Sequence, residues 1–83
     1  MDLTFPDVID KWPTAKELAD DIGCGISAVK QWKSRKSIPG EYWLRFELAA
    51  RRRGIEKVTV FTLSEIADRN RRAEPKRAKQ VAQ

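Results

Sequence analysis

Histidine is absent from the 83-residue chain, and cysteine occurs once, as Cys24. A single cysteine cannot form an internal disulfide, and without histidine the sequence offers no ligand set for zinc. The missing histidine also removes the Ser–His and Cys–His pairs that activate the nucleophile in many enzymes. We therefore expect no catalytic activity, no bound metal and no other cofactor.

Long apolar runs are missing as well. The chain has no apolar segment typical of a signal peptide and no stretch of about 20 apolar residues, the length that a membrane-spanning helix needs. These features predict a soluble, cytoplasmic, single-domain protein with no membrane partner and no small-molecule substrate. Aromatic residues end at Phe61, which predicts a core confined to the chain before residue 62.

The chain carries a formal net charge of +5, which favours polyanionic partners such as nucleic acid. This charge is unevenly distributed. Residues 1–21 contain six acidic residues and two lysines, whereas residues 29–36 contain four basic residues and no acid. Residues 68–83 contain six basic and two acidic residues. The pattern predicts a surface with one DNA-facing side.

Capping signals and apolar periodicity divide the chain into short helices. Thr4 can cap a first helix that Pro13 ends, with an apolar face at i, i+3, i+4 and i+7 formed by Phe5, Val8, Ile9 and Trp12. Thr14 and Glu17 make a capping-box sequence that opens a second helix. Gly23 can end this helix in the left-handed conformation.

Two further helices are expected in the middle of the chain. One covers about residues 26–34, and the next opens at Pro39 and ends at Gly54. The arginines at positions 51–53 fall in its last turn, where cations oppose the helix dipole.

The last part of the chain gives mixed signals. Residues that favour strands allow a short extended segment near residues 57–61. A second capping box, formed by Thr62 and Glu65, predicts a fifth helix over about residues 63–72. The basic segment 74–83 lacks apolar periodicity, which predicts a disordered tail.

The segment from residue 14 to residue 39 resembles the helix-turn-helix of the phage repressor and Cro family. It places a helix, a tight turn at residues 23–25 and a second helix within about twenty residues. The resemblance covers residues 4–54 and depends on residues at the spacing with which that family packs its two helices: Leu18, Ala19, Ile22, Gly23, Val29 and Trp32, followed by Ile38 and Pro39. A plain helical hairpin within a bundle is the alternative interpretation.

The resemblance implies which residues read DNA bases: the early exposed positions of the second helix, here Ile26, Ser27, Lys30 and Gln31. Gln31 can form two hydrogen bonds with adenine, and Lys30 can donate to guanine. Ser27 is open to a base or a phosphate, and Ile26 to a thymine methyl group or to packing against the preceding helix. Gly25 departs from the family's pattern, which usually has Thr or Ser as the cap here.

Five further residues are expected to contact the DNA backbone: Lys16, Lys33, Ser34, Arg35 and Lys36. A solvated charged face is the alternative interpretation for this group. Trp32 and Trp43 lie in phase with other apolar residues, which favours core positions over stacking on unpaired bases.

The expected fold class is all-α, with four to five short helices around a helix-turn-helix. Residues 1–73 would form the DNA-binding domain with a C-terminal dimerisation element, and residues 74–83 the basic tail. The expected function is sequence-specific binding of double-stranded DNA as a homodimeric transcriptional regulator, with repression favoured and activation left open. The dimer contact would come from residues 58–61, from the fifth helix, or from both. The alternatives are a helical protein-interaction adaptor resembling an antirepressor, and an RNA or single-strand binder.

Overall fold

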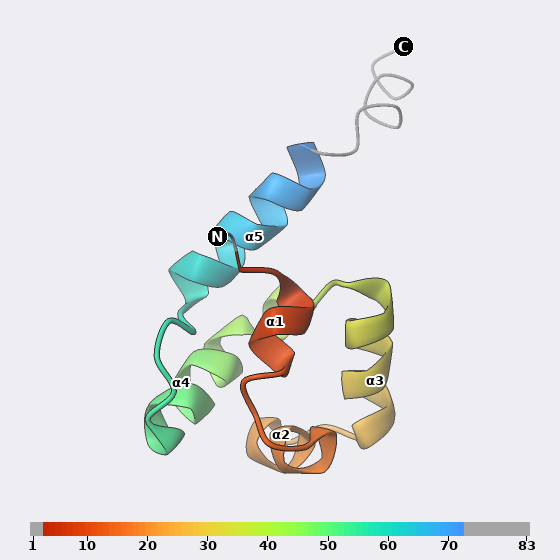
Figure 1. The fold of residues 1–83 in the computed structure, drawn as a ribbon, viewed down its shortest axis with the longest axis vertical. Coiled ribbons are helices and arrows are strands. Elements are labelled where there is room, and N and C mark those ends of the chain that lie inside the picture. The colour runs from red at the N-terminus through yellow and green to blue at the C-terminus, as the bar shows by residue number, and fades with distance from the viewer. Residues whose placement is uncertain (1–2, 73–83) are drawn as a thin grey trace.

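The computed structural model describes residues 3–72, which form an all-helical fold without strands, as expected (Figure 1). One turn of 3-10 helix, η1 (Gly40–Tyr42), precedes the fourth of five α-helices: α1 (Phe5–Ile9), α2 (Ala15–Ile22), α3 (Ile26–Arg35), α4 (Trp43–Arg53) and α5 (Val60–Arg72). The predicted tail, residues 74–83, lies outside the described residues. None of the described helices is both long enough and apolar enough to span a membrane.

A complete capping box starts α1. The Thr4 hydroxyl accepts the Asp7 N–H, and the Asp7 carboxylate accepts the Thr4 N–H. The helix ends at Ile9 and does not continue to Pro13, as the sequence had suggested. The Trp12 N–H donates to the Ile9 carbonyl in an i to i+3 bond of 3.2 Å, so the chain leaves the helix through a tighter turn that still buries Trp12.

Only half of the capping box predicted for α2 forms. The Thr14 hydroxyl accepts the Glu17 N–H at 3.1 Å. The Glu17 carboxylate accepts a hydrogen bond from Arg53 at 3.0 Å. A residue distant in sequence therefore takes the group that local capping was expected to use.

The fifth helix begins three residues earlier than predicted, at Val60, so no extended segment forms near residues 57–61. Thr59, and not Thr62, caps the helix, because its hydroxyl accepts the Thr62 N–H at 3.0 Å. The carboxylate of Glu47 in α4 accepts the Val60 N–H at 2.7 Å. These two acceptors satisfy the first amides of α5 and favour helix over strand there.

Phe46 lies fully buried at the centre of the core. Trp12 contacts its ring edge-on at a centroid distance of 5.7 Å, and Trp32 lies 5.9 Å away. The core does not stop before residue 62, as the aromatic residues had suggested, because Leu63 and Ile66 of α5 are also fully buried. Aliphatic side chains thus extend the core beyond the last aromatic residue.

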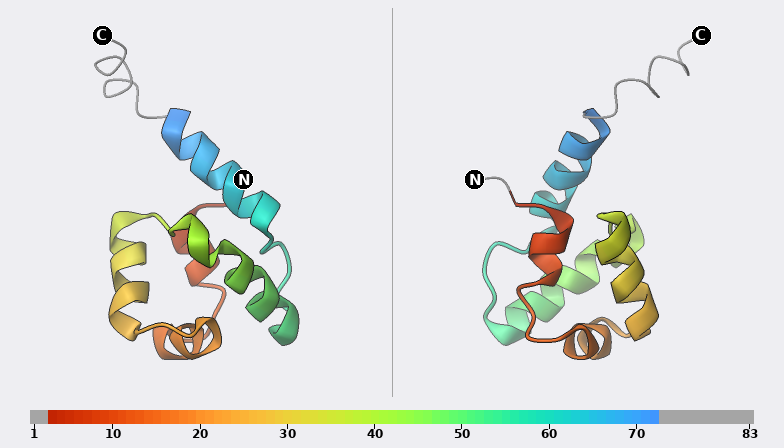
Figure 2. Two further views of the ribbon diagram at one scale, coloured as in Figure 1. Left: turned by 180° about the vertical axis from the view of Figure 1, so that it is seen from behind. Right: turned by 45° about the vertical axis from the view of Figure 1, so that its right-hand side comes forward.

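α3 lies at the margin of the molecule. In Figures 1 and 2, α3 forms one edge of the body and α4 ends at the opposite edge. α3 packs against α1 and α2. α5 packs against α4 and projects beyond the body on the side away from α2 (Figure 2). One side of α3 is consequently open to a partner.

Candidate nucleic-acid interface

The turn between α2 and α3 has the geometry that the sequence predicts. Gly23 adopts the left-handed conformation with φ of 85°, and its N–H donates to the Ala19 carbonyl at 2.8 Å. Cys24 donates to the same carbonyl at 3.0 Å. A residue with a Cβ atom is strained at such a φ, so glycine lets the chain turn directly into α3. Ala19, 1% exposed, allows close packing of the two helices.

The inner face of α3 is anchored by two side chains. Val29 is 1% exposed and Trp32 is 7% exposed. The Trp32 ring lies 4.8 Å from the Tyr42 ring, centroid to centroid. The core position predicted for Trp32 is therefore confirmed, and its ring is not available to stack on a base. Trp43 is half-buried, and its indole N–H donates to the Ile38 carbonyl at 2.9 Å.

The outer face of α3 is polar and exposed. Ser27, Lys30, Gln31 and Ser34 recur at i, i+3, i+4 and i+7, and all four side chains are exposed. Within the described part of the chain, neither Lys30 nor Gln31 has a side-chain hydrogen bond or an ion pair. Ile26, at the start of the same helix, is 39% exposed, so both contacts considered for it remain open. All the residues expected to reach bases thus occur on one accessible helix.

Gly25 caps α3 without a side-chain hydrogen bond, because it has no side chain to offer. This agrees with its departure from the Thr or Ser expected at this position. The first amides of α3 therefore have no side-chain acceptor, and they lie beside the exposed Ser27.

Two of the expected phosphate contacts are engaged in ion pairs. Lys33 lies 2.7 Å from the carboxylate of Asp10, and Lys16 lies 3.1 Å from that of Asp20. The lysine side chains are 53% and 70% exposed, respectively. Exposed pairs of this kind contribute about 0.2–1 kcal/mol, so a phosphate can displace either carboxylate at little cost.

The remaining expected phosphate contacts, Ser34, Arg35 and Lys36, are exposed. Among the described residues neither Arg35 nor Lys36 has an acidic partner. Lys36 ends α3 in the left-handed conformation with φ of 59°, and its N–H donates to the Lys33 carbonyl. The two cations therefore flank the C-terminal end of the exposed face.

Sequence reasoning missed the ionic cluster that joins α2 to α4. Both the Arg53 guanidinium and the Trp12 indole N–H donate to the Asp21 carboxylate, the latter at 2.9 Å. The Arg53 hydrogen bonds are the main reason why the pKa of Asp21 lies below its ordinary value. Arg45 adds a hydrogen bond to the Ile22 carbonyl at 3.3 Å, at the end of α2. The sequence did contain a signal, because residues 17–21 are rich in acidic residues and positions 51–53 are arginines. From the sequence, these arginines were explained by the helix dipole alone.

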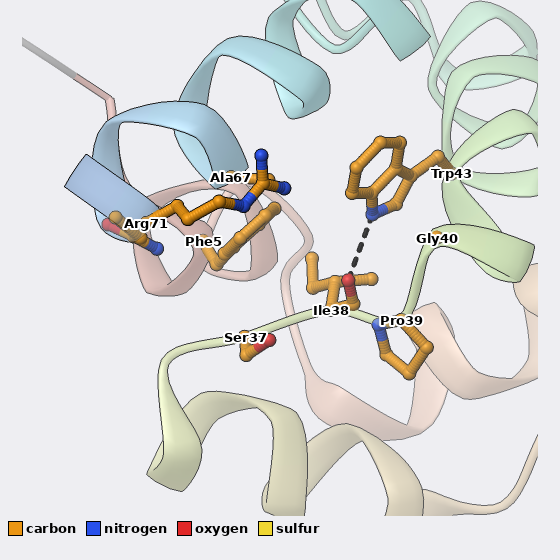
Figure 3. Close-up of a pocket in the computed structure, with 9 residues that line it drawn as sticks. Phe5, Ser37, Ile38, Pro39, Gly40, Trp43, Ala67 and Arg71 are labelled. Carbon is orange, nitrogen blue, oxygen red and sulfur yellow. Dashed lines mark hydrogen bonds between the residues drawn. The ribbon is translucent and has the colours of Figure 1, made fainter. Parts of the chain in front are cut away.

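An open cleft of about 470 Å³ lies between α1, α5 and the segment before α4 (Figure 3). Phe5 and Trp43 stack across it at a centroid distance of 6.4 Å, and Arg71 lies at its rim. Among the described residues that line it there is no carboxylate. Burial raises the pKa of the Cys24 thiol, which favours its unreactive protonated form.

The chain matches no protein-family model, no curated protein and no solved structure. The assignment of a function therefore depends on the residues of α2 and α3 and on their arrangement.

Proposed function

We propose that this protein binds double-stranded DNA sequence-specifically and regulates transcription, with α3 as its recognition helix. The observation that carries the proposal is the division of α3 into two faces. Val29 and Trp32 anchor one face in the core, while the opposite face presents exposed hydrogen-bonding side chains at helical spacing. A helix of this kind fits the major groove, where base pairs present distinct patterns of donors and acceptors.

Each exposed residue has a role that suits its chemistry. Gln31 pairs with an adenine through its amide, and Lys30 donates to the acceptors of a guanine. Ser27 and Ile26 contact the flanking bases, Ile26 through a thymine methyl group. These residues form the base-reading part of α3.

The phosphate contacts come from residues around this face. Lys33, Ser34, Arg35 and Lys36 lie along the last turns of α3, and Lys16 lies in the first turn of α2. Four of them are cations, which neutralise phosphates, release counterions and orient α3 in the groove.

A single α3 offers few base contacts, which limits both affinity and selectivity. We therefore propose that the protein acts as a homodimer on two half-sites about one helical turn apart. Occupation of such an operator in the cytoplasm or nucleoid would repress transcription. The buried Trp32 and the internally bonded Trp43 favour duplex DNA over unpaired nucleic acid, because neither ring is free to stack on bases.

Selection of binding sites from a random duplex library tests the proposal. The expected result is one enriched motif with two related halves, bound with a strong dependence on salt. Enrichment of no motif, or a preference for single strands of the same length, would overturn the assignment. A variant with Ser27, Lys30 and Gln31 all changed to alanine is the matched protein control, since these side chains are exposed and the fold does not depend on them. It should retain the wild-type melting temperature and select nothing.

A further inference from the structure

Apart from Ile26, three large apolar side chains are exposed among the described residues. Leu44 is 57% exposed, Leu48 is 40% exposed and Phe61 is 70% exposed. Leu44 and Leu48 are four residues apart and lie on the face of α4 opposite the buried Phe46 and Ala50. Neither the core nor the exposed face of α3 uses these side chains.

The three side chains come from neighbouring turns of two helices. Glu47 lies in the turn of α4 between Leu44 and Leu48, and its carboxylate accepts the N–H of Val60 at 2.7 Å. Phe61 follows Val60 in the first turn of α5 and points away from the buried Leu63 and Ile66. The junction of α4 and α5 therefore carries an apolar surface.

Charged residues bound this surface along α4. Glu41, in η1 directly before α4, and Leu44, Leu48 and Arg52, in α4, recur at spacings of three, four and four residues. We refer to these four residues as the α4 stripe. Glu41 and Arg52 are exposed at its two ends. Glu41 makes no ion pair with any other described residue, and Arg52 donates a hydrogen bond of 3.4 Å to the Asp21 carbonyl within its own chain. The stripe thus has an acidic end, an apolar middle and a basic end.

Such a stripe complements a second copy of itself. When two α4 helices pack antiparallel about a twofold axis, Leu44 of one copy lies opposite Leu48 of the other. Glu41 then meets Arg52 twice, once on each side of the axis. A parallel arrangement would place like charges together. The sequence of charges along the stripe therefore selects the antiparallel arrangement.

We infer that the α4 stripe and Phe61 form the interface of a homodimer in which α4 packs antiparallel against its copy. The use of this dimer on paired half-sites rests on the proposed DNA-binding function. The stripe shares no residue with the recognition helix, and α4 runs from the end of α3 toward the opposite edge of the body (Figure 2). Val58, earlier considered for the contact, is 3% exposed and belongs to the core. An interface this small predicts weak association, which two adjacent half-sites would strengthen.

Sedimentation equilibrium of the full chain without DNA tests the inference. Wild type should show a monomer–dimer equilibrium. Leu44→Ser and Leu48→Ser should each raise the dimer dissociation constant by about tenfold or more. Glu41→Arg and Arg52→Glu should each weaken self-association, because each places like charges together twice. Glu56→Arg is the matched control for Glu41→Arg, since Glu56 is exposed outside the stripe and the charge change is the same.

The decisive experiment mixes the two charge-reversed proteins. Glu41→Arg and Arg52→Glu should associate with each other more tightly than either does with itself, and a chain carrying both changes should again form homodimers. Circular dichroism melts verify that every variant is folded. The inference is overturned if wild type remains monomeric, if the serine variants associate like wild type, or if the charge-reversed proteins do not pair. Sedimentation without DNA and selection from the duplex library test the two proposals separately. A protein that stays monomeric but selects one duplex motif would refute the interface alone. A protein that dimerises but selects no duplex motif would refute the proposed function alone.

Discussion

Arg53, at the end of α4, donates hydrogen bonds to the carboxylate of Asp21 in α2, 32 residues earlier in the chain. The same carboxylate accepts the Trp12 indole N–H. Asp21 therefore links α2 to the turn after α1 and to α4.

The pKa of Asp21 lies below its ordinary value of 3.8 mainly because of the Arg53 hydrogen bonds, with partial burial opposing and the Trp12 bond adding to the shift. A carboxyl whose pKa is lower in the folded state stabilises the fold above its unfolded pKa, and this contribution is lost as the pH falls through the folded pKa. We expect Asp21→Asn to lower the free energy of unfolding by about 1 kcal/mol at neutral pH, allowing for solvent screening. The deficit should shrink below about pH 4.

Urea unfolding at several pH values measures this effect. Asp20→Asn is the matched control, since Lys16 is the only ion-pair partner of Asp20 among residues 3–72 and the Asp20 side chain is 67% exposed. Equal losses in the two variants, or a deficit of Asp21→Asn that does not change with pH, would contradict the prediction.

Trp32→Ala should destabilise the fold by about 3–5 kcal/mol, because the change removes a buried aromatic ring and leaves a cavity. Phe61→Ala removes a ring that is 70% exposed and should cost less than about 0.5 kcal/mol. Chemical denaturation of both variants, at protein concentrations low enough to keep the chain monomeric, gives the comparison. A near-native stability of Trp32→Ala would mean that its ring is not part of the core.

Lys36→Gly should be more stable than Lys36→Ala by about 0.5–1 kcal/mol, because a left-handed φ of 59° disfavours any residue with a Cβ atom. Both variants lose the same charge, so the difference between them isolates the backbone. Thermal melts measure it, and equal melting temperatures would show that the end of α3 relaxes to another conformation.

Gln31→Ala removes the bidentate hydrogen bonds but no charge. It should cost about 1–3 kcal/mol on the preferred operator and leave affinity for random duplex almost unchanged. The observable is the ratio of specific to random affinity at two salt concentrations. If both affinities fall by the same factor, Gln31 does not read a base.

Arg35→Ala should weaken binding to specific and random DNA by similar factors and reduce the salt slope by about one. Lys33→Ala should reduce it less, because Asp10 at 2.7 Å already offsets part of the Lys33 charge. When Asp10 is also changed to asparagine, Lys33→Ala and Arg35→Ala should reduce the salt slope by the same amount. Equal slopes for both variants in the wild-type background would show that DNA displaces Asp10 completely.

The sequence alone was sufficient for most features that depend on neighbours in the chain, the cap of α5 by Thr59 being an exception. The Thr4 and Thr14 hydroxyls cap helices through amides three residues away, and Gly23 and Gly54 end helices through their own φ angles of 85° and 74°. The two faces of α3 follow from the period of 3.6 residues in the same way. These interactions need no distant partner, so the elements and the exposed residues of the candidate interface could be predicted.

Only the tertiary structure decided features that need a distant partner. α5 starts at Val60 because Glu47, 13 residues away, accepts its N–H. The Asp10–Lys33 and Asp21–Arg53 pairs depend on how α1, α2, α3 and α4 pack together. The exposure of Leu44 and Leu48 likewise depends on where α5 crosses α4, because periodicity distinguishes the faces of a helix but does not show which of them another helix will cover.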